Sequence, residues 1–200
     1  MCIRDSAVTV RAGSKAEMAL PDGTFVHLNA ATNLEYDVNN SKQRLVKLSG
    51  EAFFDVAKNP DCPFKVIIND LQIEVVGTSF NVKTYKKDIV ETSLLSGRIR
   101  ISGGSLPHEY TLSPGQKATY SAMDRTLRIS KADAHVEAGW RDNYLIFEST
   151  PLIDVIAQIE RWYGVEIRLH HKQIAQDLLS GSFRNESIQT VSYTHLRAHE

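Results

Sequence analysis

The stretch LSGEAFFDVAKNP, residues 48–60, decides the fold of the surrounding chain. Gly50 separates an apolar run from two adjacent phenylalanines, Phe53 and Phe54, and Pro60 closes the segment. Neighbouring residues of a strand point to opposite faces, so the two rings predict a strand with one aromatic side chain on each face. A glycine permits a bend before this strand, and a proline ends it because it cannot donate to the ladder. The stretch is therefore predicted to be a corner between two strands.

Glu51 raises the question whether this corner is an active site. If the segment is a strand, Glu51 and Asp55 lie on one face about 13 Å apart. That separation is too large for a pair of carboxylates that share acid–base work. The sequence favours a structural role, in which Glu51 accepts a hydrogen bond from a backbone N–H or pairs with Arg44 or Lys47.

From Thr24 to Ile129, apolar and polar residues alternate in short runs. A period of two is typical of strands with one buried face. The clearest runs are residues 24–29, 44–50, 64–70, 71–77 and 97–104. Turn-forming residues separate the runs at 20–23, 38–41, 59–63, 102–104 and 113–116. The pattern predicts a mainly β protein with an all-β domain over residues 7–132, either a sandwich or a twisted, solenoid-like coil of strands.

After a linker predicted at residues 133–139, the pattern changes to that of a small α+β module. Apolar residues 152, 155, 156, 159 and 163 form the stripe of an amphipathic helix, predicted over 151–163. Thr150 is expected to cap it, Pro151 to occupy its first turn and Gly164 to end it. Alternating residues predict strands at 144–149, 165–171 and 178–185, which gives a truncated βαββ module over 140–191.

The two ends of the chain do not continue the neighbouring patterns. Residues 1–6 and 192–200 resemble translated sequencing-adapter DNA and are expected to be non-native tails. His195 and His199 have the spacing of two metal ligands on a helix, but they lie in this tail, so no metal site is predicted. A module that lacks its second helix is expected to leave Ile167 and Phe183 exposed.

Composition and motifs argue against several classes of function. The formal charge is −1, without a basic block, so no nucleic-acid partner is expected. No apolar stretch reaches the roughly 18 residues of a membrane span. Two cysteines do not make a disulfide scaffold, and Cys62 is expected to be a small buried side chain. No nucleophile elbow, phosphate loop or metal cluster is present, so neither catalysis nor a cofactor is predicted.

Five motifs, in this order, resemble the periplasmic domain of FecR-family anti-sigma regulators of the Bacteroidetes type. They are LPDGTFVHLNAATNLEY (20–36), RLVKLSGEAFFDVAKNPDCPFKV (44–66), VVGTSFNVKTY (75–85), TSLLSGRIRI (92–101) and LSPGQKA (112–118). The segment GWRDNYLIFESTPLIDVIAQIERWYGVEI (139–167) resembles the C-terminal domain of the same regulators, which is similar to the short N-terminal domain of secretins and TonB-dependent receptors. We assign structural roles to these motif residues: Asp22, Gly23, Gly50, Glu51, Phe54, Val56, Gly77, Thr78, Phe80, Gly97, Pro114, Gly115, Trp140, Pro151 and Gly164.

The resemblance implies a periplasmic signalling protein that is not an enzyme. In the family, a cytoplasmic N-terminal region binds an extracytoplasmic-function sigma factor, and one transmembrane helix anchors the protein in the inner membrane. This sequence shows neither part, so contact with the sigma factor and with the membrane is expected only through the missing N-terminal region and transmembrane helix of a full-length parent. The periplasmic part is expected to receive a signal from the signalling domain of a TonB-dependent outer-membrane receptor.

The C-terminal module is expected to bind this receptor domain by adding a strand to an open sheet edge. The candidate edges carry Tyr144 and Ile146, or Glu166 and Arg168.

Two alternatives to a signalling protein are considered. A carbohydrate-binding or adhesive β-module would use exposed aromatics, for which Phe25, Phe53, Phe54 and Tyr85 are available. A solenoid polysaccharide enzyme would gather Glu91, Arg98 and Arg100 in a groove.

Overall fold

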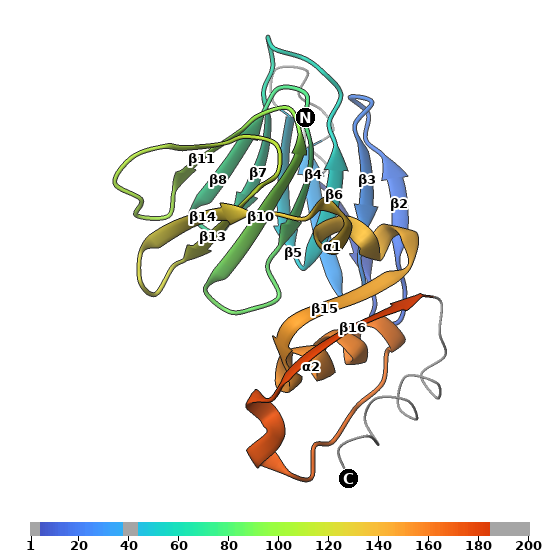
Figure 1. Cartoon of the computed structure of the whole chain (residues 1–200). Coiled ribbons are helices and arrows are strands. Elements are labelled where there is room, and N and C mark those ends of the chain that lie inside the picture. Colours follow the sequence, from blue (N-terminus) through green and yellow to red (C-terminus); the bar gives the residue numbers. More distant parts are fainter. Residues whose placement is uncertain (1–4, 38–43, 185–200) are drawn as a thin grey trace.

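Most of the chain forms two seven-stranded sheets (Figure 1). The computed structural model describes residues 5–37 and 44–184. All neighbouring strands run antiparallel except β5 and β7, which are parallel. The first sheet consists, in spatial order, of β1 (Asp5–Val10), β4 (Thr32–Asp37), β5 (Arg44–Ser49), β7 (Phe64–Ile68), β8 (Leu71–Val75), β11 (Ile99–Gly103) and β12 (Tyr110–Leu112).

The second sheet packs against the first. It consists, in spatial order, of β14 (Thr126–Lys131), β13 (Gln116–Ser121), β10 (Ile89–Ser96), β9 (Ser79–Lys83), β6 (Glu51–Asp55), β3 (Phe25–Leu28) and β2 (Ala16–Ala19). The chain crosses from the first sheet to the second between β5 and β6, at Gly50. The predicted corner is therefore present, and each run of alternation predicted between residues 24 and 104 corresponds to a strand.

One apolar core lies between the two sheets. From β6, the ring of Phe54 points inward and lies 5.8 Å from Phe64 of the opposite sheet, measured between ring centroids. Phe53 points to the outer face of the second sheet, where it packs against Trp140. Burial of a ring such as Phe54 contributes roughly 1.5–3 kcal/mol to the stability of the folded state. Because a single core joins two facing sheets, the domain is a sandwich.

The C-terminal part forms a small βαβ module. Its elements are α1 (Ala134–Ala138), the 3-10 turn η1 (Gly139–Asp142), β15 (Tyr144–Pro151), α2 (Leu152–Tyr163), the 3-10 turn η2 (Lys172–Gln176) and β16 (Leu178–Arg184). β15 and β16 make an antiparallel two-stranded sheet. The buried face of α2 packs on this sheet through Leu152, Val155, Ile156 and Ile159. The predicted linker at 133–139 contains helix α1.

The predicted strand over residues 165–171 is wrong, because this segment pairs with none of the strands that the structure describes. Its alternation has another cause. Ile167 and Leu169 pack against the core of the module, and the backbone N–H of Ile167 donates to Oε1 of Glu160 at 2.7 Å. Alternate side chains are thus partly buried without a ladder. The module has the order βαβ and not the predicted βαββ.

Two further details of the module differ from prediction. Thr150 does not cap α2: the helix begins after Pro151, and the N–H of Leu152 donates to the carbonyl of Asp177 at 2.8 Å. The expected exposure of Phe183 is also wrong, since only 4% of it is exposed. Its ring contacts Phe147 beneath α2, so one helix is enough to cover it. The predicted C-cap is confirmed, because Gly164 has φ 67° and ends the helix.

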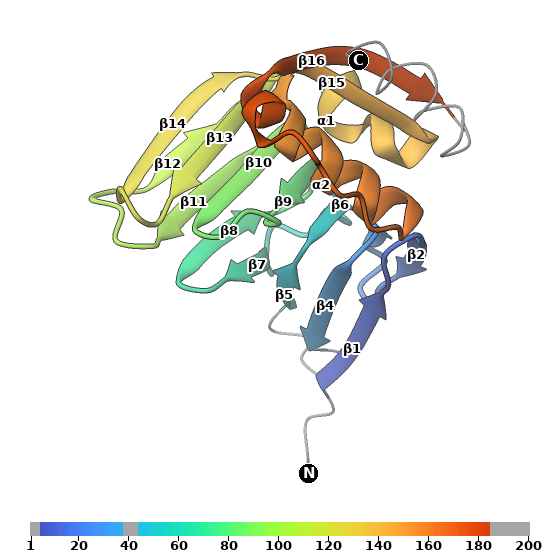
Figure 2. The same ribbon diagram turned by 90° about the horizontal axis from the view of Figure 1, so that it is seen from below.

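The module lies at one end of the sandwich (Figure 1). Viewed from below, the C-terminal end of α2 lies beside the loop that joins β1 to β2 (Figure 2). There the N–H of Gly13 donates to the carbonyl of Arg161 at 2.8 Å. Of the expected adapter tails, residues 1–4 and 192–200 lie outside the described residues, whereas Asp5 and Ser6 belong to β1. The turn predicted at 38–41 and the pair His195 and His199 also lie outside the described residues.

Candidate functional site

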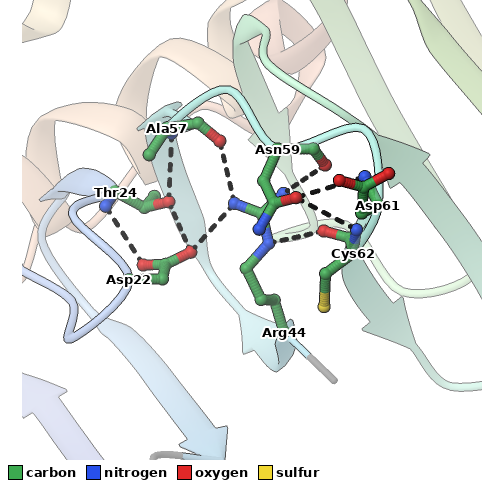
Figure 3. Close-up of polar contacts among 7 residues, drawn as sticks. All are labelled: Asp22, Thr24, Arg44, Ala57, Asn59, Asp61 and Cys62. Atoms are coloured by element: carbon green, nitrogen blue, oxygen red, sulfur yellow. Dashed lines mark hydrogen bonds and ion pairs between the residues drawn. The ribbon is translucent and has the colours of Figure 1, made fainter. Parts of the chain in front are cut away.

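Residues of the motifs at 20–36 and 44–66 form a polar cluster around Arg44 (Figure 3). Arg44 is the first residue of β5 and is 7% exposed. Its Nε donates to the carbonyl of Cys62 at 2.7 Å, Nη1 to that of Ala57 at 2.8 Å and Nη2 to that of Asn59 at 3.3 Å. A planar guanidinium can satisfy several acceptors at once. Arg44 therefore fixes the loop 57–62 to the first sheet, and Cys62 is buried in that loop as predicted.

The motif residue Asp22 completes this cluster. Its Oδ2 lies 3.2 Å from Nη1 of Arg44 and accepts a hydrogen bond from Oγ1 of Thr24 at 2.8 Å, while its Oδ1 accepts from the N–H of Thr24 at 3.0 Å. The N–H of Ala57 donates to Oγ1 of Thr24 at 3.3 Å. Gly23 adopts φ 84°, which lets the chain turn here. The motifs around residues 22 and 59 are thus parts of one polar cluster.

Glu51 is buried, with 4% of its surface exposed. Its Oε2 accepts a hydrogen bond from Nδ2 of Asn29 at 2.7 Å, and its Oε1 accepts one from Nδ2 of Asn81 at 2.9 Å. The prediction that Arg44 or Lys47 pairs with Glu51 is wrong, because both pair with other carboxylates. Glu51 therefore links β6 to β9 and to the residue that follows β3, and no ion pair involves it among the described residues.

The same network continues to the C-terminal module. Nε1 of Trp140 donates to Oδ1 of Asn81 at 3.1 Å, and the indole packs against Phe53 and Ala138. The guanidinium of Arg141 lies 3.6 Å above the ring of Phe53. A buried amide that both donates and accepts has a fixed orientation. Trp140 is therefore buried, and it joins the module to the sandwich.

The motif glycines Gly50 and Gly97 lie against threonines. A Cβ at Gly50 would lie 2.5 Å from Oγ1 of Thr32, and a Cβ at Gly97 would lie 2.6 Å from Oγ1 of Thr78. Oγ1 of Thr78 donates to the carbonyl of Arg98 at 3.1 Å. Both positions therefore require glycine, because a side chain at either would collide with the threonine that packs against it.

The remaining motif residues belong to the core and its turns. Phe54 and Phe80 stack with centroids 5.2 Å apart, and the N–H of buried Val56 donates to the carbonyl of Thr78 at 3.0 Å. Gly77 approaches the backbone of residue 58 closely. Pro114 and Gly115 form the turn between β12 and β13, where the N–H of Gly115 donates to the carbonyl of Leu94 at 2.9 Å.

Lys15, between β1 and β2, reaches into the contact between the two parts of the chain. Its Nζ donates to the carbonyl of Trp140 at 2.7 Å and to Oδ1 of Asn143 at 2.9 Å, and it lies 3.5 Å from the ring centroid of Trp162. Burial lowers the pKa of Lys15 to about 8, although Glu51 opposes this shift. One side chain thus contacts both ends of the segment 140–162.

Helix α2 makes a second set of contacts with the loop between β9 and β10. Oδ2 of Asp154 lies 2.7 Å from Nζ of Lys86, and the guanidinium of Arg161 lies 4.1 Å above the ring of Tyr85. The hydroxyl of Tyr85 donates to the carbonyl of Ala30, and burial raises the pKa of this phenol above its usual value. These contacts fix α2 to the second sheet.

A cleft of about 390 Å³ remains between the second sheet and the module. Side chains of both charges line it, among them Lys83, Glu91, Lys117, Glu137 and Arg161. Nζ of Lys117 lies 3.2 Å from Glu91 and 2.8 Å from Glu137. Burial disfavours the charge of Lys117, but the two carboxylates outweigh this effect and raise its pKa. The cleft is a polar boundary between the two parts of the chain.

The structure separates the four residues expected at the partner edge. Tyr144 and Ile146 lie on β15 and line the cleft. Glu166 and Arg168 lie on the segment that is not a strand, and their exposed side chains pair with one another at 3.1 Å. The latter two cannot form the predicted strand edge.

Sequence reasoning missed three residues of the site: Lys15, Asn29 and Asn81. Asn81 lies within a strand, where asparagine is depleted, and this was a signal that it has a specific partner. Lys15 and Asn29 carried no such signal, because lysine and asparagine are common in loops.

The structure does not bring together the residues expected for the two alternative functions. Of the aromatics proposed for a sugar surface, Phe53 and Phe54 are buried, Tyr85 is partly buried, and Phe25 is 39% exposed. Glu91 lies on β10 of the second sheet, whereas Arg100 lies on β11 of the first and pairs with Glu74.

Within residues 5–37 and 44–184, no three His, Cys, Asp or Glu side chains gather in a group that could hold a metal ion. None of the described helices is long and apolar enough to cross a membrane.

Comparison with known proteins agrees with the two-part architecture. Residues 6–100 match the family described as FecR protein, and residues 144–191 match the family described as FecR, C-terminal. Two crystal structures of a candidate anti-sigma factor from Parabacteroides distasonis superpose with a TM-score of 0.87 at 30% identity. They cover 96% and 97% of this chain, which spans 91% of each of them. No curated protein sequence matches significantly. The motif clusters and the superposition over both parts show that the chain belongs to the FecR family.

Proposed function

We propose that this chain is the periplasmic signal-relay part of a membrane-anchored anti-sigma regulator. It receives a signal from a TonB-dependent outer-membrane transducer and controls an extracytoplasmic-function sigma factor. Membership of the FecR family and the likeness to a candidate anti-sigma factor support a role in sigma-factor regulation. In this proposal, an N-terminal cytoplasmic region binds the sigma factor and a transmembrane helix carries the signal to it.

The observation that carries the proposal is the two-stranded sheet of the C-terminal module. β15 and β16 pair only with each other among the described strands, so each has one edge without a strand neighbour. Unpaired N–H and C=O groups at such an edge can pair with an added strand. The module is also attached to the sandwich at several points, so a displacement of the module can be transmitted to the rest of the chain.

The proposed receptor contact is on β15. The cleft follows this strand from Tyr144 to Thr150, which leaves space beside its side chains. Ile146 is partly exposed there, and Tyr144 contacts His135 and the guanidinium of Arg184. A receptor segment added along β15 would cover these two side chains, and the aromatic ring would supply a large contact area.

Binding to the purified signalling domain of the matched TonB-dependent receptor tests this function. Titration calorimetry of the chain is expected to show that Ile146→Ala and Tyr144→Ala each raise the Kd about tenfold, equivalent to about 1.4 kcal/mol. Ile129→Ala is the matched control, since Ile129 is an exposed apolar residue on β14 of the sandwich. Glu166→Ala and Arg168→Ala are expected to leave the Kd unchanged. No detectable binding by the wild-type chain would overturn the proposed function.

A further inference from the structure

The turn at residues 11–15 joins two edge strands, one from each sheet. β1 is the last strand of the first sheet and β2 the last strand of the second. Among the described strands, β1 pairs only with β4, along six residues from Asp5 opposite Asp37 to Val10 opposite Thr32. An edge strand with a single neighbour opens at a lower free energy than a central strand. A displacement of this turn therefore acts on a weakly held strand.

The same turn lies directly against the C-terminal end of α2, where the N–H of Gly13 donates to the carbonyl of Arg161 at 2.8 Å. The backbones of Gly13 and Gly164 face each other, both with positive φ, at 76° and 67°. A Cβ at Gly13 would lie 3.2 Å from the carbonyl oxygen of Tyr163, and one at Gly164 would lie 3.2 Å from that of Ala12. No flexible side chain separates the two backbones here. Movement at the end of α2 therefore displaces the turn directly.

Lys15 adds a second connection from the same turn. Its ammonium group binds the carbonyl of Trp140 and Oδ1 of Asn143, just before β15, and lies over the ring of Trp162 near the end of α2. The turn thus contacts both elements that bound the module's core. Burial of the ammonium group strengthens such contacts, since water screens them less.

One of the other connections between the module and the sandwich offers a comparison. The pair of Lys86 and Asp154 joins α2 to the loop between β9 and β10, but their side chains are 58% and 30% exposed. Exposed ion pairs contribute little because water and salt screen them. This connection also ends on central strands of the second sheet and not on an edge strand.

We propose that the turn at residues 11–15 transmits displacement of the C-terminal module to strand β1, through the contact of Gly13 with Gly164 and through Lys15, and so controls the pairing of β1 with β4. The coupling within the chain stands on these contacts alone. Its use in signalling rests on the proposed function, in which a receptor loads the module and the membrane anchor precedes β1.

Hydrogen–deuterium exchange of the purified chain, read by mass spectrometry, tests the coupling without any receptor. Gly164→Ala and Lys15→Met are each expected to raise the exchange rate of the β1 amides about tenfold. β13 and β14, at the far edge of the second sheet, are expected to exchange as in the wild type. Gly115→Ala introduces a side chain at a similar φ of 79° but into open space, and Lys86→Met removes the ion pair with Asp154; neither is expected to affect β1.

Two results would overturn the coupling. One is unchanged exchange of β1 in both Gly164→Ala and Lys15→Met; the other is a rise in β1 that β13 and β14 share, which would mean general loss of stability. A receptor domain that fails to bind in calorimetry contradicts the proposed function but leaves this exchange experiment unaffected. The two ideas can therefore fail separately.

Discussion

The indole Nε1 of Trp140 donates a hydrogen bond to Oδ1 of Asn81 across 3.1 Å, between residues 59 positions apart in the chain. Asn81 in turn donates to Glu51, and Glu51 accepts from Asn29. A single buried network therefore links the C-terminal module to three strands or strand ends of the sandwich. Removal of its members one at a time shows how much each connection contributes.

Trp140→Phe is expected to lower the free energy of unfolding by about 1–2 kcal/mol, because the ring still fills its place but Oδ1 of Asn81 loses its donor. Urea unfolding measures this change. Trp162→Phe is the control, since the Trp162 indole N–H has no hydrogen-bond partner among the described residues and its ring lies at the same interface. A loss as large for Trp162→Phe as for Trp140→Phe would contradict the role of the hydrogen bond.

Glu51→Gln is expected to cost about 1–3 kcal/mol of unfolding free energy. The amides of Asn29 and Asn81 cannot reverse, because their carbonyl oxygens already accept from the N–H of Ala30 and from Trp140. The new NH2 group therefore faces a donor. Glu35→Gln changes an exposed carboxylate 3.6 Å from Lys47 and should cost less than about 0.5 kcal/mol. Equal effects in urea unfolding would show that burial of Glu51 is unimportant.

Arg44→Lys keeps the charge but cannot reach the carbonyls of Ala57, Asn59 and Cys62 together. The unfolding free energy is expected to fall by about 2–4 kcal/mol, and the loop 57–62 should become sensitive to limited proteolysis. Arg100→Lys alters an ion pair whose arginine is exposed, and its unfolding free energy should lie within about 0.5 kcal/mol of the wild-type value. Resistance of the loop to protease in Arg44→Lys would refute the proposed role of the guanidinium.

Gly50→Ala is expected to cost at least about 3 kcal/mol, since φ is 116° and the added Cβ would lie 2.5 Å from Oγ1 of Thr32. Gly115→Ala, at φ 79° with open space around it, should cost about 1–2 kcal/mol from backbone strain alone. Thermal unfolding of the two variants compares them. Similar Tm values would mean that the corner at residue 50 relaxes freely.

The pH dependence of stability is expected to report on Lys15. Its pKa is about 8 in the folded chain against 10.5 for an ordinary lysine, so above pH 8 the unfolded state binds more protons than the folded state. The free energy of unfolding should therefore gain a contribution that rises with pH from about 8 toward 10.5. The raised pKa of Tyr85 acts in the opposite direction only above pH 10. Between pH 8 and 9.5, urea unfolding should show this rise in the wild type and not in Lys15→Met; parallel curves would contradict it.

Much of the fold follows from local patterns. Alternation predicted the strands, Phe53 and Phe54 on opposite faces predicted the corner after Gly50, and the apolar stripe with Gly164 predicted α2 and its end. Each of these signals lies within a few residues and concerns backbone conformation or the buried face. Such preferences act before any distant contact forms.

Alternation failed at residues 165–171, because a period of two shows which side chains are buried but not whether a neighbouring strand exists. Here Ile167 and Leu169 are partly buried against the core beneath α2, and the backbone bonds to Glu160. The capping prediction at Thr150 failed for a similar reason, since the carbonyl of Asp177 supplies the acceptor from another part of the chain.

The sequence by itself determined a β-rich domain with a corner at Gly50, followed by a small module built on one amphipathic helix. Only the tertiary structure decided that the sheets form a sandwich, that two asparagines satisfy Glu51 and that Lys15 reaches the module. The physical reason is distance along the chain: Asn29 and Glu51 are 22 positions apart, and Lys15 and Trp140 are 125 apart. Such partners are chosen by the packing of the whole fold, which no local periodicity contains.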